Sequence, residues 1–305
     1  MILTSYVNSL IENIDKKKCP EEIDLVLDGG AFNGMYMLGA LFYLKALEEK
    51  KIIKINRISG TSIGAAFGLF YKLNKLDVIL EFSKKSYEIL RKNQDLKKIK
   101  LWFDKQMDIH LTNEFLECVN NKLYITYFDT HKKKQIVKKK YKTINEIKDT
   151  VFKTTHFPYL IDRVFTDKEG CMDGAFPYIF KQKSNSKKKI LFINLQSIDK
   201  FINMIYIKKE KNIFTRVFKG LMDIHEFFNN NKPTKMCSYV NEWGIIDILL
   251  FRLREIVYTI VFYIFTLGLQ IESIIPENLK REQIIIKCVS IFKNIWRDLL
   301  IYLTI

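Results

Sequence analysis

The N-terminal quarter of the chain contains two strand-like segments, and each is followed by a glycine-containing break and then by helical periodicity. The segments are Ile23–Leu27 and Ile55–Ile58. After the first break, apolar residues recur at helical spacing, at Met37, Leu38, Leu41, Leu44 and Leu47. After the second break, Ala65–Tyr71 predicts another helix. This order of strand, loop and helix is typical of an α/β fold.

Further along, Leu123–Phe128 and Gln135–Lys138 are both strand-like, and the turn between them contains His131. They predict a hairpin with this histidine at its exposed tip. Residues 1–22 predict a short amphipathic helical segment. They do not resemble a signal peptide, because their basic residues follow the apolar stretch and Glu12 interrupts it.

The segment Ile256–Ile271 carries no charge over 16 residues. As a helix it spans about 24 Å at ~1.5 Å per residue, which is short of the ~30 Å core of a bilayer. It predicts a buried helix, an interfacial membrane anchor in which Phe262 and Phe265 insert, or a true span. The final segment, Ile284–Ile305, is amphipathic and predicts a packing helix.

Composition adds a strong charge asymmetry. The chain has 305 residues, of which 48% are hydrophobic, enough for a proper core. Its 50 Lys+Arg against 34 Asp+Glu give a net charge of +16. Seven basic and seven acidic residues balance after residue 239, so the whole excess lies before it. Such a charge attracts polyanions, either nucleic acid or an anionic membrane.

Several function classes lack support. No lysine run is interleaved with aromatic residues, so no nucleic-acid partner is expected. The cysteines are five in number and widely spaced (19, 118, 171, 237 and 288), which argues against a disulfide framework and structural zinc. This usage favours a reducing, intracellular compartment, with the protein cytoplasmic or attached to a membrane.

Glycines cluster where backbone must turn tightly or approach a ligand. Seven of the 12 glycines lie between residues 29 and 68. The first cluster, DGGAFNG at 28–34, links a strand to a helix, and its backbone N–H groups can hold a phosphate or a developing oxyanion. The second, Gly60-Thr61-Ser62-Ile63-Gly64, fits the G-x-S-x-G nucleophile elbow, in which a serine projects from a strained strand-to-helix turn.

A nucleophilic serine needs a base. None of the four histidines (110, 131, 156 and 225) stands out. Asp173 lies in an irregular turn, Asp173-Gly174-Ala175, and is either a catalytic base or a solvated turn residue.

Together, DGGAFNG, GTSIG and DGA, in that order, resemble the patatin-like phospholipase family. The resemblance extends to the 123–138 hairpin and to KTTHFPYLID at 153–162, and it covers residues 23–195. It implies an α/β/α sandwich with a mainly parallel central sheet. Residues 196–305 lie beyond the resemblance, and their apolar segments predict a mostly helical C-terminal extension. It also implies hydrolysis of lipid acyl esters by a Ser–Asp dyad, without histidine, metal or cofactor. By position, Ser62 is the nucleophile, Asp173 is the base, and the oxyanion hole is formed by the amides of Gly29, Gly30, Ala31 and Gly34.

Two positions depart from the family pattern. Ala31 replaces a glycine, which predicts ordinary backbone angles there. Asn33 replaces an arginine or lysine, which removes a positive charge near the oxyanion loop.

The expected substrate is a phospholipid or related acyl ester, reached at a membrane surface. Two alternatives remain open: a catalytically weak, lipid-binding protein, and an esterase that uses an unrecognised histidine.

Overall fold

The computed structural model describes residues 2–12, 14–16, 19–93, 96–158, 161, 164–181, 188–197, 200, 204, 206, 212 and 214–274, with isolated positions at 291, 295, 298 and 302. For residues 264–274 it describes the backbone alone. The helix expected at Ile284–Ile305 therefore lies outside the described residues, apart from those isolated positions.

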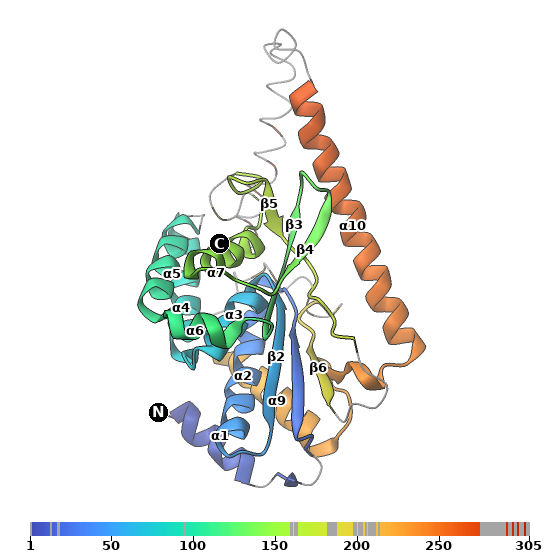
Figure 1. The fold of residues 1–305 in the computed structure, drawn as a ribbon. Coiled ribbons are helices and arrows are strands. Elements are labelled where there is room, and N and C mark those ends of the chain that lie inside the picture. The colour runs from blue at the N-terminus through green and yellow to red at the C-terminus, as the bar shows by residue number, and fades with distance from the viewer. Residues whose placement is uncertain are drawn as a thin grey trace.

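A seven-stranded sheet forms the centre of the molecule (Figure 1). Its main path runs β4-β3-β2-β1-β6-β7, and β5 pairs with β3 beside it. The strands are β1 (Glu22–Leu27), β2 (Lys54–Thr61), β3 (Leu123–Asp129), β4 (Lys134–Lys138), β5 (Cys171–Asp173), β6 (Lys189–Ile193) and β7 (Cys237–Tyr239). The four central strands are parallel, while β4, β5 and β7 are antiparallel to their neighbours. The expected α/β fold with a mainly parallel sheet is confirmed.

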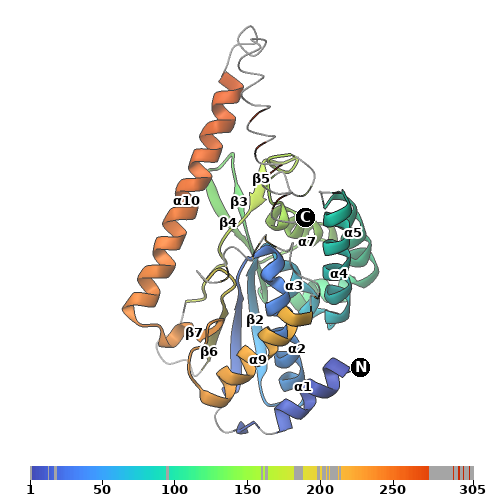
Figure 2. The ribbon, with the colours of Figure 1, turned by 180° about the vertical axis from the view of Figure 1, so that it is seen from behind.

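Helices cover both faces of this sheet. They are α1 (Ile2–Glu12), α2 (Gly34–Glu49), α3 (Ile63–Lys72), α4 (Leu76–Asn93), α5 (Lys97–His110), α6 (Asn113–Val119), α7 (Ile144–Thr155), α9 (Phe214–Asn230) and α10 (Ile245–Ile274). The two turned views place α2, α3 and α9 on one face, while α10 is the one helix of the described residues that runs along the other side (Figures 1 and 2).

The alternation of side chains along the strands explains this division. In β1, Leu25 and Leu27 join the large core under α2, α3 and α9. Val26, between them, points the other way and packs in a smaller cluster with Phe192 of β6 and Phe251 of α10. Strand β1 is thus buried on both faces over residues 23–27, as is typical of strands inside a parallel sheet.

Residues after 195 complete this domain. Strand β7 extends the sheet beside β6, and α9 packs so closely on α2 that a side chain at Gly39 would strike the backbone of Val217. The predicted boundary at 195–196 therefore does not mark the end of the packed core.

The uncharged segment of the sequence lies within α10, a helix of 30 residues. No helix in the described part of the chain combines the length and apolarity needed to cross a bilayer. Phe262 is buried against Phe128, with ring centroids 4.4 Å apart, so its expected role as an inserting residue is wrong. The side chain of Phe265 lies outside the described residues.

Candidate active site

Ser62 lies at a sharp turn between β2 and α3. Its backbone angles, φ 52° and ψ −131°, are rarely adopted by a residue with a side chain. A Cβ at Gly64 would lie 2.5 Å from the carbonyl oxygen of Asp28, and one at Gly60 would lie 2.7 Å from the backbone of Ala65. The flanking glycines therefore allow the turn, and the strain is held by the packed strand and helix around it.

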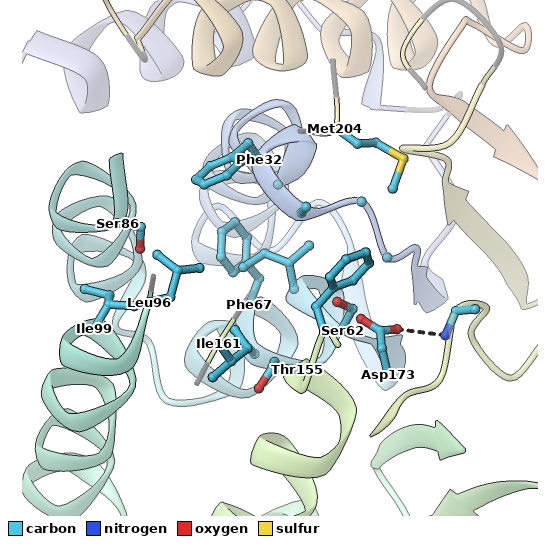
Figure 3. Close-up of a pocket in the computed structure, with 18 of the residues that line it drawn as sticks. Phe32, Ser62, Phe67, Ser86, Leu96, Ile99, Thr155, Ile161, Asp173 and Met204 are labelled. Atoms are coloured by element: carbon cyan, nitrogen blue, oxygen red, sulfur yellow. Dashed lines mark hydrogen bonds between the residues drawn. The ribbon is translucent and has the colours of Figure 1, made fainter. Parts of the chain in front are cut away.

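Asp173 reaches the same place from β5. Its carboxylate is within hydrogen-bond reach of the Ser62 hydroxyl, and its Oδ1 accepts from the N–H of Ala175 at 2.8 Å (Figure 3). The backbone N–H of Asp173 donates to the carbonyl of His156 at 3.0 Å. The pairing of β5 with β3, and of β3 with β2, brings the two residues together across 111 positions of sequence.

The surroundings of Asp173 tune its basicity. Burial raises the pKa of its carboxyl to about 6, and the negative charge of Asp28 adds to this. The hydrogen bonds from Ser62 and Ala175 act in the opposite direction. A carboxylate with a pKa near neutrality is a stronger base than an exposed one, and it stays ionised at pH 7.

The glycine loop at 28–34 approaches Ser62 from β1. The N–H of Gly29 donates to the carboxylate of Asp28 at 3.0 Å, and the N–H of Gly34 turns back to the carbonyl of Ala31. Among the described residues, no protein acceptor faces the N–H groups of Gly30 and Ala31. Of the four expected amides, these two are the ones available to a ligand.

A cavity of about 370 Å³ opens beside these groups. One end holds Ser62, Asp173 and the glycine loop, and the rest is mostly apolar, with a few polar side chains such as Ser86 and Thr155 (Figure 3). The apolar walls come from α3, α4, α5, α7 and α10, and include Phe67, Phe82, Leu96, Ile99, Phe103 and Phe262. Such a shape fits a flexible hydrocarbon chain whose polar end lies at the serine.

Comparison with known proteins agrees with this geometry. The family model for patatin-like phospholipase matches residues 25–191. The chain belongs to the patatin-like phospholipase family. This is a family of lipid acyl hydrolases, and the match contains all three motifs found in the sequence. The comparison with curated proteins found no match.

The alanine that departs from the patatin pattern does not have ordinary backbone angles. Ala31 has φ 44°, in the left-handed region that a glycine enters freely. The expectation from sequence was therefore wrong, because the loop keeps the shape that it would have with glycine.

The second departure is compensated by a distant residue. The side chain of Asn33 is buried and donates to the carbonyls of Leu195 and Lys200, each at 2.9 Å. Its Oδ1 accepts from the guanidinium of Arg216, at 3.1 Å, which reaches in from α9. The region beside the glycine loop therefore contains a cation after all, although position 33 does not supply it.

None of the four histidines lines the cavity. His131 is at the exposed turn between β3 and β4, and His110 ends α5. His225 interacts with the hydroxyl of Tyr43 on the far side of the sheet from α10. His156 is buried and contributes its backbone carbonyl to Asp173, as described above.

Sequence reasoning missed four residues that build the site. Thr154 accepts from the N–H of Ser62 at 2.8 Å and so holds the strained turn. Gln196, Arg254 and Tyr258 contact the glycine loop or its partners. Thr154 lies in the KTTHFPYLID segment, which offered a signal, but the other three are in no recognisable motif.

Proposed function

We propose that this protein is a serine hydrolase that cleaves carboxylic ester bonds of phospholipids or related lipids with a Ser62–Asp173 dyad. The observation that carries the proposal is the contact between Ser62, at its strained turn, and the carboxylate of Asp173, at the polar end of an apolar cavity. Membership of the patatin-like phospholipase family supports the same chemistry.

In the acylation step, Asp173 accepts the hydroxyl proton as the Ser62 oxygen bonds to the ester carbonyl carbon. The N–H groups of Gly30 and Ala31 stabilise the negative charge that develops on the carbonyl oxygen. Collapse of this intermediate breaks the bond to the alcohol portion, which takes the proton from Asp173 and leaves an acyl group on Ser62.

In the deacylation step, Asp173 accepts a proton from water, and the water oxygen attacks the acyl carbonyl. The second tetrahedral intermediate uses the same two N–H groups. Its collapse returns the proton to the Ser62 oxygen and releases a fatty acid. The apolar cavity holds the acyl chain throughout, and this favours long-chain over short-chain esters.

Contact with a membrane surface belongs to this proposal, because the substrate is lipid. The outer side of α10 carries large apolar side chains over about five turns, among them Ile245 (74% exposed) and Leu249 (61% exposed). Soluble proteins seldom expose such a continuous apolar surface unless it binds something. The net charge of +16 favours an anionic bilayer as the occupant, and the lysine-rich β3–β4 turn lies beside α10 in both views (Figures 1 and 2).

The nucleophile is tested with a fluorophosphonate probe, which bonds covalently to activated serines. We expect the wild type to be labelled and Ser62→Ala to be unlabelled, with unchanged thermal unfolding. Equal labelling of the two proteins would rule out Ser62 as the nucleophile. A wild type that binds vesicles but hydrolyses no ester would favour the lipid-binding alternative.

The base is tested by pH dependence. Because Asp173 must be ionised to accept a proton, and its pKa is about 6, kcat/KM should fall as the pH drops through about 6. Asp173→Asn keeps the shape of the side chain and should lower kcat by about 10²–10⁴-fold. An equal loss in His156→Ala, with normal folding, would instead favour a histidine base.

A further inference from the structure

A buried ion pair joins α10 to the start of the glycine loop. The guanidinium of Arg254 donates to both carboxylate oxygens of Asp28, at 2.8 and 3.1 Å. Asp28 has no exposed surface, and 17% of the Arg254 side chain is exposed. Burying two charges is costly unless their mutual geometry is good. Because the Nε of Arg254 has no hydrogen-bond partner among the described residues, the burial of this guanidinium depends on its two contacts with Asp28.

The Asp28 carboxylate also orients the backbone of the loop. It accepts from the N–H of Gly29 at 3.0 Å and from the N–H of Leu195 at 3.3 Å. The peptide that follows Gly29 carries the N–H of Gly30, one of the two that have no protein acceptor among the described residues. The position of the carboxylate therefore influences where that donor points.

Gln196 links the glycine loop to the Asp173 turn. Its Nε2 donates to the carbonyl of Gly29 at 3.1 Å and to the carbonyl of Ala175 at 3.0 Å. Its Oε1 accepts from the hydroxyl of Tyr258 at 2.6 Å, and Tyr258 lies one turn after Arg254 on α10. The same side of α10 thus holds both halves of the candidate site, one through Asp28 and the other through Gln196.

We propose that Arg254 and Tyr258 are positioning residues that hold the glycine loop and the Asp173 turn in the relative position needed for the reaction. Arg254 acts through Asp28, and Tyr258 acts through Gln196. This inference rests on the function proposed above. Its physical basis is that a misplacement of about 1 Å between preorganised groups can lower a rate about 10²-fold. The helix whose outer side is apolar is then the same helix that aligns the reacting groups.

Electrostatics supply a readout that a purely structural role would not affect. The Ser62 hydroxyl and the Ala175 N–H donate to the carboxylate of Asp173, and the N–H of Asp173 donates to the His156 carbonyl. Asp28 and Tyr258 interact with Asp173 electrostatically, Arg254 pairs with Asp28, and Lys100 of α5 lines the same cavity. The negative charge of Asp28 raises the pKa of Asp173. Asp28→Asn removes this charge, so the acid limb of the rate profile should move to lower pH.

The test is a double-mutant cycle on a soluble short-chain ester. Arg254→Met should lower kcat about 10–100-fold and leave KM within about twofold. Arg254→Lys keeps the charge and should recover part of the loss. Adding Asp28→Asn to Arg254→Met should cost much less than Asp28→Asn costs alone, because both changes act through one pair. Arg252→Met, on the exposed side of the same helix, should behave as the wild type.

Tyr258→Phe removes one hydroxyl and provides the second variant if Arg254→Met fails to fold. It should lower kcat several-fold with KM and thermal unfolding unchanged. The inference would be overturned by an unchanged kcat in both Tyr258→Phe and a folded Arg254→Met, or by additive effects in the cycle. In either case, an active wild-type protein would leave the proposed function standing. A wild type that turns over no ester would remove both.

Discussion

The two faces of the central sheet are covered in different ways. On one face, α2, α3 and α9 form a layered core in which most apolar side chains are fully enclosed. On the other, within the part of the chain that the structure describes, one long helix, α10, contributes a narrow stripe of buried residues that includes Phe251 and Phe262. The difference teaches that an apolar helix need not be a buried one, because α10 is apolar on its exposed side as well.

The two faces also differ in how they use polar groups. The face under α2 and α9 is closed by backbone contact and apolar packing. The α10 face is held by directed interactions, the Arg254–Asp28 pair and the Tyr258–Gln196 hydrogen bond. Substitutions should therefore have different consequences on the two faces.

The largest effect is expected where α9 meets α2. A Cβ at Gly220 would strike the carbonyl of Tyr36 and lie 2.8 Å from its Cα. Gly220→Ala should lower the free energy of unfolding by about 1–3 kcal/mol or more, since helix backbones cannot separate without disturbing the core. Gly244→Ala is the matched control at the start of α10, where the nearest atom is 3.7 Å away, and it should change stability by less than about 0.5 kcal/mol. Equal Tm losses in thermal denaturation would contradict the comparison.

A smaller effect is expected from the exposed side of α10. The triple change of Leu249, Leu253 and Ile256 to Ser should leave the Tm and short-chain esterase activity nearly unchanged, because these side chains are more than half exposed. It should weaken binding to anionic vesicles at least about tenfold. A tenfold change in affinity corresponds to about 1.4 kcal/mol, which the lost burial of these apolar side chains in the bilayer can supply. Sedimentation with vesicles in low and high salt measures this.

Salt separates the two contributions to vesicle binding. Salt screens the charges of the basic loops but does not affect apolar insertion. In high salt, wild-type binding to vesicles should therefore be weaker but still measurable, whereas binding of the triple variant should be lost. Identical binding of the two proteins would show that this side of α10 does not meet the membrane.

The smallest effect concerns a strained point in the glycine loop, which lines the cavity. Ala31→Gly relieves the left-handed φ of 44° but adds flexibility to the unfolded chain. Because the left-handed strain of about 1–2 kcal/mol exceeds that entropy cost, we expect a net stabilisation of roughly 0.5 kcal/mol. Ala65→Gly, within α3, should instead destabilise by about 1 kcal/mol. A lower Tm for Ala31→Gly in calorimetry would show that the loop is not strained.

Much of the fold could be predicted because its signals are local. The strands at 23–27 and 123–128 begin or end within one residue of β1 and β3, and the turn with His131 is where the hairpin was expected. The strand before Ser62 is longer than predicted and runs to Thr61, because its last residues are the small ones of the elbow itself. Strand and helix periodicity depend on neighbours a few residues away, so these elements can be recognised from the sequence alone.

The candidate site was only partly predictable. Ser62 could be found from the glycines around it, since their spacing reflects a local steric need. Asp173 remained ambiguous from its own residues and was assigned through resemblance, because the burial that makes it a base is a property of the assembled sheet. The predicted insertion of Phe262 failed for a related reason: apolarity alone does not say which side of a helix meets the protein.

The sequence by itself determined the glycine-dependent turns, the alternation of strands and helices, and the excess of positive charge, because each depends on residue type and short spacing. The tertiary structure alone decided that Arg254 meets Asp28 across 226 positions, that Arg216 supplies the cation absent at Asn33, and that α10 is buried on one side. These outcomes depend on where the chain path brings distant charges and surfaces together. No local pattern encodes that path, because the energy of each contact exists only once the intervening sheet has formed.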